Sequence, residues 1–198
     1  MDTEILISLL VIAAIVMIAL GAWYYYRSRT SENLKERFGP EYENTVRQLK
    51  SQDRAEAELK ERQKRVSKYK IVVLPRAERD KYREVWRGVQ GEFVDQPEKA
   101  VSDADRLVQE VMERCGYPLR DFEQAAADLS VDHPYVVENY RSACRTADRS
   151  RRGAADTEEL RQAVVYYRVL FEELLEDEPP RTAKPKRAAR VGEPSHNR

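Results

Sequence analysis

The side chains best suited to acid–base or nucleophilic chemistry are two histidines and two cysteines. His133 follows Asp132 in SVDHPYVVENY, an order that could pair an imidazole with a carboxylate for general acid–base catalysis. Ser130 and Cys144 are the nearest hydroxyl and thiol, but nearness in sequence does not bring side chains face to face. The simpler interpretation is that Asp132 or His133 caps a helix that begins at Pro134. We therefore assign no catalytic residue here.

Metal and cofactor signatures are also missing from the sequence. No His or Cys pair has the spacing of metal ligands, and His196 stands alone near the C-terminus. Cys115 precedes a glycine at a predicted helix end, and Cys144 falls on an apolar helix face, which is typical of buried thiols. No glycine-rich phosphate loop is present. We expect no metal, no cofactor and no enzymatic activity.

A basic run, RTAKPKRAARVG, offers a different kind of chemistry. Residues 179–198 contain four prolines, six Lys or Arg and one Glu, which predicts a disordered tail with a net charge of about +5. Its cations could contact phosphates of nucleic acid or of anionic lipid. These candidate anion-binding residues are Arg181, Lys184, Lys186, Arg187 and Arg190. No aromatic residue interleaves them, so base stacking is not supported, and a merely solubilising terminus is the alternative.

The overall composition limits these options further. The 198 residues carry 35 basic and 35 acidic side chains, and zero net charge argues against a general polyanion binder. Much of the 41% apolar content lies in one N-terminal run, so the remainder is lean in core residues. Two cysteines make no disulfide framework, which suits a reducing compartment. These features predict one small domain with polar extensions.

The apolar run extends over residues 5–26 without a charge. At 1.5 Å per residue, 22 helical residues measure about 33 Å, enough for a hydrocarbon core of about 30 Å. A signal peptide would have a basic start, whereas this chain begins MDTE. Residues 19–21 form a possible cleavage triplet, but the run continues into WYYY, which is typical of an interfacial aromatic belt. We expect an uncleaved transmembrane helix.

The basic residues around this run predict its orientation. No Lys or Arg precedes it, whereas Arg27, Arg29, Lys35 and Arg37 follow within about a dozen positions. By the positive-inside rule, residues 1–4 are translocated and the C-terminal part faces the cytoplasm.

Residues 27–70 read as a charged juxtamembrane segment. Ser31 is a potential cap for a short amphipathic turn that Gly39 and Pro40 end. Residues 41–68 then predict one long polar helix, for which a solvated spacer is favoured over a coiled-coil dimer contact because apolar positions are sparse. Acid-before-base pairs at i,i+4 would support it. These pairs are Glu43 with Arg47, Glu56 with Lys60, Glu58 with Arg62 and Glu61 with Arg65.

Residues 71–178 carry the predicted core. KIVVLP, residues 70–75, is the one β-rich run and reads as an extended strip packed on the helices that follow. Apolar stripes of helical period then predict five helices, so the expected fold is an all-α bundle. The first helix centres on residues 82–93, and the second runs from Pro97 to Gly116. The third follows Pro118, and the fourth starts at Pro134. The fifth starts near Asp156, where Glu159 completes a capping-box spacing.

Four stretches carry a resemblance to a known family: ENLKERFGPEYENTV, YREVWRGVQGEFVDQPEKAVSDADRLVQEVM, DFEQAAADLSVDHPYVVENYR and LRQAVVYYRVLFEELL. Together they resemble a bacterial family of small single-pass membrane proteins, described as hypothetical or uncharacterised, with an RFGPEY-type juxtamembrane motif. The resemblance covers residues 30–176 and implies a bacterial inner-membrane location. It implies no activity, cofactor or site residue.

The combination predicts a membrane-anchored cytoplasmic helical protein that acts as an interaction or scaffold module. A protein partner or a second copy is expected, and no small-molecule substrate is evident. Candidate contact residues are Arg37, Phe38, Tyr42, Asp132, His133 and Tyr135. For the first three, local packing around Gly39 is an equal alternative. Tethering through the basic tail is the second hypothesis, and an enzyme using Asp132 and His133 is the third.

Overall fold

The computed structural model describes the backbone of residues 2–176 and the side chains of residues 12–22, 24–25 and 28–176. This part of the chain is all-helical and has no strand, so the predicted all-α class is confirmed. The predicted tail, residues 179–198, lies outside it. The helices are α1 (Asp2–Phe38), α2 (Pro40–Leu49), α3 (Gln52–Val66), α4 (Arg76–Glu92), α5 (Pro97–Arg114), α6 (Phe122–Asp132), α7 (Val137–Arg151) and α8 (Thr157–Leu174).

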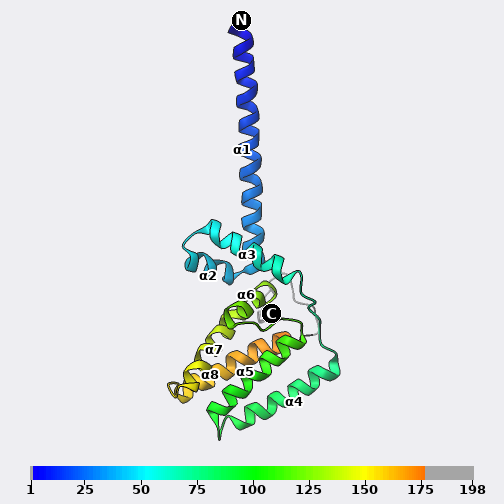
Figure 1. The fold of residues 1–198 in the computed structure, drawn as a ribbon, viewed down its shortest axis with the longest axis vertical. Helices are drawn as coiled ribbons and strands as arrows, with labels where there is room; N and C mark the ends of the chain where they lie inside the picture. The colour runs from blue at the N-terminus through cyan, green and yellow to red at the C-terminus, as the bar shows by residue number, and fades with distance from the viewer. Residues whose placement is uncertain (1, 177–198) are drawn as a thin grey trace, which may run out of the picture.

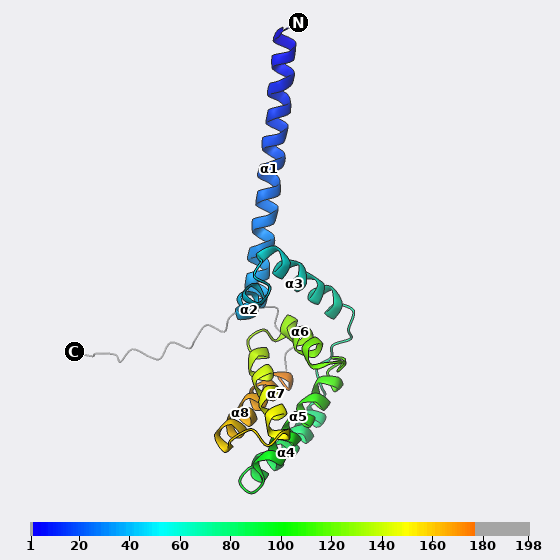
Figure 2. The ribbon, with the colours of Figure 1, turned by 60° about the vertical axis from the view of Figure 1, so that its left-hand side comes forward.

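Helix α1 is a straight rod that projects from the rest of the molecule (Figure 1). Helices α2 and α3 pack at its C-terminal end, and α4 to α8 form a body beyond them, as the turned view also shows (Figure 2). The C-terminal end of the rod is held by the buried side chains of Leu34 and Phe38, which pack with α2, α3 and Val131 of α6. Among the described residues, no helix has a stretch that is long and apolar enough to cross a membrane.

The body is a helical bundle whose centre lies between α5, α7 and α8, while α4 covers the outer side of α5. Trp86 of α4 stacks on Phe171 of α8 with their ring centroids 4.8 Å apart. The predicted capping box at the start of α8 is present, with Asp156 and Glu159 each accepting the other's backbone N–H. The apolar stripes of the sequence therefore identified helices α4 to α8 correctly.

The predicted strip before α4 has no regular secondary structure. Leu74 is buried against the bundle core, and the Val72 N–H donates to the Cys115 carbonyl at 2.9 Å. Gly116 makes this approach possible, because it has a φ of +99° and a Cβ there would lie 2.3 Å from the Lys70 carbonyl oxygen.

The predicted break at SVDHP lies later than the sequence indicated. Helix α6 continues to Asp132, and His133 caps its C-terminus by donating its backbone N–H to the Leu129 carbonyl at 2.8 Å. Proline disfavours helical backbone at the residue before it, so Pro134 ends α6 at His133. Helix α7 begins only at Val137. The prediction that Asp132 or His133 caps a helix opening at Pro134 was wrong.

The juxtamembrane segment also differs from the prediction. Ser31 caps no new helix, since α1 runs unbroken to Phe38, and its hydroxyl instead donates to Glu56 at 2.7 Å. The single helix predicted over residues 41–68 is two helices. The chain turns at Lys50, which has a φ of +52°, and Ser51 caps α3 by accepting the Arg54 N–H.

These two helices form a hairpin, α2–α3, that packs against the end of α1 and against α6. Its apolar residues form a second core with the end of α1 and with Val131 of α6. The solvated spacer was therefore a wrong prediction. Because Tyr42, Leu59 and Val66 are buried within the chain, they are not available for a coiled-coil seam.

Candidate interaction site

The six predicted contact residues come from two corners of the chain that the fold brings together. One is the α1–α2 corner, with Arg37, Phe38 and Tyr42, and the other is the α6–α7 connection, with Asp132, His133 and Tyr135. The two corners touch at Gly39, where a Cβ would lie 3.1 Å from the Cζ and Oη atoms of Tyr135. Its φ of +46° and ψ of −124° also suit glycine alone.

Phe38 and Tyr42 lie inside the second core rather than on the surface. Both are almost completely buried and pack with Leu59 and Val131. The Tyr42 hydroxyl donates to Glu56 at 2.9 Å, and burial followed by this carboxylate raises the pKa of Tyr42 to about 12. The local-packing alternative describes these two residues.

Asp132 and His133 are adjacent in sequence but have different partners. Asp132 accepts a hydrogen bond from the Tyr117 hydroxyl at 2.9 Å, and Arg37 lies 3.9 Å from it. The buried imidazole of His133 directs Nδ1 toward Glu173, at 3.3 Å, and its ring meets the Tyr117 ring edge-on. The geometry thus directs the imidazole to a carboxylate of α8 and not to Asp132.

Tyr135 and Arg37 are the predicted contact residues that reach the surface. Tyr135 is 57% exposed although its ring rests on Gly39, and the side chain of Arg37 is 34% exposed. A large, rigid aromatic that is held in place by a neighbouring backbone is the kind of residue that dominates protein–protein binding energies.

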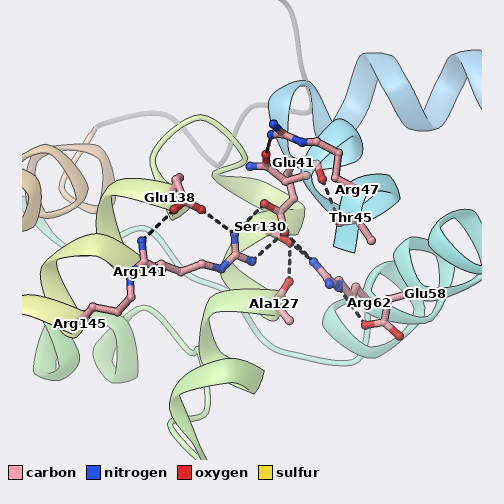
Figure 3. A network of polar contacts seen from close by, with 11 residues as sticks. Glu41, Thr45, Arg47, Glu58, Arg62, Ala127, Ser130, Glu138, Arg141 and Arg145 are labelled. Carbon is pink, nitrogen blue, oxygen red and sulfur yellow. Dashed lines mark hydrogen bonds and ion pairs between the residues drawn. The ribbon is translucent and has the colours of Figure 1, made fainter. Parts of the chain in front are cut away.

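A buried ion network centres on Glu41, two residues beyond Gly39 (Figure 3). No pattern in the sequence indicated that Glu41 and Arg141 would meet. Glu41, at the start of α2, accepts hydrogen bonds from Arg62 of α3 at 2.8 Å and from two nitrogens of Arg141 of α7 at 2.7 Å each. All three residues are more than 90% buried. Arg62 also donates to the Ser130 hydroxyl at 3.3 Å. One carboxylate therefore joins the rod corner, the hairpin and the bundle.

The electrostatics of Glu41 follow from its two cationic partners. Burial alone raises the pKa of Glu41, but the hydrogen bonds and charge of Arg141, and then those of Arg62, outweigh burial and hold this pKa below its ordinary value. Burial lowers the pKa of Arg141, but the hydrogen bonds and the charge of Glu41 raise it, and the net shift of this pKa is upward. The folded structure thus favours the ionised carboxylate of Glu41 and the charged guanidinium of Arg141.

Two more carboxylates attach the hairpin in the same manner. Asp128 of α6, 1% exposed, accepts hydrogen bonds from Arg65 at 2.7 Å and from the Tyr69 hydroxyl at 2.8 Å. Glu56 accepts hydrogen bonds from Ser31 of α1 and Tyr42 of α2. Of the four predicted i,i+4 pairs, the one between Glu58 and Arg62 forms, at 3.0 Å.

The two thiols are placed for packing. Burial raises the pKa of Cys115 to about 11 and that of Cys144 to about 12, so both are protonated at neutral pH. Cys144 borders a cavity of about 190 Å³ between α5, α6 and α7, with Asp105 and Tyr140 in its wall. Within the described residues, no group of His, Cys, Asp and Glu side chains is arranged to hold a metal ion.

Comparisons with protein-family models, with curated proteins and with solved structures find no match to this chain. The fold and its corner therefore define the class: an all-α protein in which a hairpin at the end of a projecting helix is joined to a small bundle through a buried ion network.

Proposed function

We propose that this protein is a single-span membrane protein whose helical body binds another protein at the cytoplasmic face of the bacterial inner membrane. The observation that carries the proposal is the apolar surface of the projecting rod. Exposed apolar side chains of α1 are Ile12, Ile15, Val16, Met17, Ile18 and Leu20, at 49 to 75% of their full accessibility. A contiguous apolar surface of this kind is unfavourable in water and favourable in hydrocarbon.

The sequence supplies the rest of the anchor argument. Residues 5–26 are uncharged and lie within the single helix α1, and the basic residues follow them. In this proposal residues 1–4 lie outside, residues 5–26 span the bilayer, and residues 71–178 form the cytoplasmic body, to which residues 27–70 are docked. Membership of the hypothetical bacterial family that the sequence resembles belongs to the same proposal.

The interaction face we propose is the corner around Tyr135 and Arg37. Tyr135 and Arg37 are the two reachable predicted residues, and Tyr and Arg are enriched among residues that dominate binding. Phe38, Tyr42, Asp132 and His133 lie beneath it and would hold its shape. We propose a binding role rather than catalysis, because the imidazole, the thiols and the carboxylates of this region are engaged in structural contacts.

Topology tests the first half of the proposal. A reporter that fluoresces only in the cytoplasm and a phosphatase active only in the periplasm would be fused separately to the C-terminus. Fluorescence without phosphatase activity is expected. Phosphatase activity without fluorescence would reverse the orientation, and a chain recovered entirely from the aqueous fraction would refute the anchor.

A photo-activated cross-linker tests the second half. It would replace Tyr135 in cells, and a matched control would carry it at Val94, which is 84% exposed at the end of the α4 region. We expect a discrete adduct, to a partner or to a second copy, from position 135 alone. Equal adducts from both positions, or none from position 135, would contradict the proposed face.

The alternative function is a tether to nucleic acid or to anionic lipid through the basic tail. It is supported by the sequence of residues 179–198, which lie outside the described part of the chain. Deleting these residues should then abolish salt-sensitive binding to either polyanion. Unchanged binding would exclude the tether.

A further inference from the structure

A groove of about 510 Å³ lies between the end of α1, one face of α3 and the end of α6. Residues 60, 63, 64 and 67 follow each other at i, i+3, i+4 and i+7, so they line it from a single helical face. The polar residues that line the groove are Arg37, Lys60, Gln63, Lys64, Ser67 and Asp132.

The positive charge in this groove is poorly neutralised. Three of the lining residues are cationic and one is acidic, and that acid, Asp132, already accepts a hydrogen bond from Tyr117. Within the described chain, Lys60 forms no ion pair, and Lys64 reaches only Glu61, at 3.9 Å. The Lys64–Glu61 distance is at the limit of an ion pair. Both lysine ammonium groups can therefore bind an anion in the groove.

Arg37 gives a second, independent reason to expect anion binding at this groove. Its one ion pair with a described residue is to Asp132, at 3.9 Å. Its Nε atom is buried and has no hydrogen-bond partner among the described residues. Buried N–H donors are normally satisfied, and because the Arg37 side chain as a whole is 34% exposed, an oxyanion in the groove could bind this guanidinium in a bidentate way.

We propose that this groove binds the dianion of a phosphate monoester. The lining charge of three cations and one carboxylate is about +2, which a phosphate dianion neutralises and a carboxylate does not. The Arg37 guanidinium and the two lysine ammonium groups supply donors only, and the phosphate supplies acceptors. The Gln63 amide adds a neutral donor on the same face.

The position of the groove favours a soluble phosphate ester over a lipid headgroup, a step that rests on the proposed anchor. Arg37 lies 11 residues beyond Tyr26 in the same helix, a distance of about 16 Å. The headgroup layer on one side of a bilayer is only about 5–8 Å thick. A bound ester would contact α1, α3 and α6 together, and would thereby stabilise the docked hairpin.

The test is a titration of the full chain, in uncharged detergent at low ionic strength and pH 8, with inorganic phosphate. The groove variant is Lys60→Gln with Lys64→Gln. The matched control is Arg54→Gln with Lys68→Gln, which removes the same charge from exposed positions near the same helix and outside the groove. We expect saturable binding that the groove variant weakens about tenfold or more and that the control changes by less than about threefold.

Two results would overturn the site: no saturable binding by the wild type, or equal weakening in both variants. The source of the phosphate is tested in nanodiscs that contain either phosphatidic acid or phosphatidylglycerol at the same net charge. We expect equal phosphate affinity in both. Phosphate could instead bind more weakly in phosphatidic acid discs, with the groove variant abolishing this difference between the two kinds of disc. That result would place a lipid headgroup in the groove and overturn the soluble source.

Discussion

At the scale of single residues, Glu41 connects three helices of this structure. It is 2% exposed and holds Arg62 and Arg141, which come from different helices and are themselves buried. A charge in the protein interior is tolerated only when partners compensate it, so losing the central carboxylate would leave two cations without their anion.

Replacing Glu41 with glutamine tests this role. The neutral amide keeps the volume of the side chain, so the expected loss of about 3–5 kcal/mol in the free energy of unfolding reflects the uncompensated charges. The control is Glu58→Gln, which removes the half-exposed partner of the same Arg62 and should cost less than about 1 kcal/mol. Urea unfolding of the full chain in detergent, followed by circular dichroism, measures both. Equal losses would show that Glu41 is no more important than a surface carboxylate.

The same residue predicts an acid-sensitive fold. The pKa of Glu41 in the folded protein is below the ordinary value of 4.5, so folding favours its ionised form. Its contribution to stability is complete above about pH 4.5 and is lost as the pH falls through the lower, folded-state pKa. Glu56, whose pKa is also lowered, adds to this loss.

The free energy of unfolding should therefore fall with decreasing pH below about 4.5 in the wild type. The decline should be shallower in a Glu41→Gln variant, because an amide does not titrate in this range. Unfolding curves recorded at a series of pH values would give both slopes. Parallel slopes would mean that Glu41 has the same pKa in the folded and unfolded chain.

At the scale of secondary structure elements, the corner between α1 and α2 depends on one glycine. Gly39 combines a φ of +46° with close contact to the Tyr135 ring, so a side chain would meet backbone strain and would also press on that ring. By contrast, Gly88 lies in the interior of α4, where an added Cβ would have open space within 4 Å.

Gly39→Ala should lower the free energy of unfolding by about 1–3 kcal/mol, and it should also weaken any partner binding at Tyr135. Gly88→Ala should raise the free energy of unfolding by up to about 1 kcal/mol, because alanine is the better helix former. Thermal unfolding of the two variants under the same conditions compares them. A harmless Gly39→Ala substitution would show that the corner can relax.

The elements also show what the sequence could predict. Helices α4 to α8 were visible because Trp86, Val89, Leu160 and Phe171 repeat at helical spacing on one face, and burial of such a face is what makes a helix stable. The hairpin was not visible, because its few apolar contacts, such as that with Val131, are supplemented by charged residues in its attachment to the body. Glu56 and Arg65 had sequence neighbours that suggested surface pairs, whereas their real partners, such as Asp128, are distant in sequence.

The candidate site was predicted only in part for the same reason. Proximity of Gly39 and Tyr135 follows from the docking of the hairpin on α6, which depends on long-range contacts such as that between Glu41 and Arg141. A sequence pattern reports local spacing and burial, and it carries no signal for which buried acid meets which arginine.

At the scale of the whole molecule, the hairpin and the bundle are two packed layers joined by ions. Backbone amides in α3 should therefore be protected from hydrogen exchange to a degree comparable with α6, whereas a solvated spacer would exchange rapidly. In a Glu41→Gln variant, exchange should rise in α2, α3 and α6 and stay unchanged in α8. Mass spectrometry of the full chain resolves these segments. Rapid exchange of α3 in the wild type would contradict the docked arrangement.

The unbroken course of α1 sets the position of the body relative to the proposed membrane. Leu34, the first buried side chain among the described residues of α1, lies eight helical positions beyond Tyr26, the end of the apolar run, which is a rise of about 12 Å. A rigid helix of that length fixes both the height of the body above the bilayer and the direction in which Tyr135 faces. Each residue added or removed in this stretch would turn the body by about 100° around the helix axis. This stretch would thus set a defined angle as well as a height, and in the proposed topology a membrane-bound partner would meet the proposed interaction face from one side.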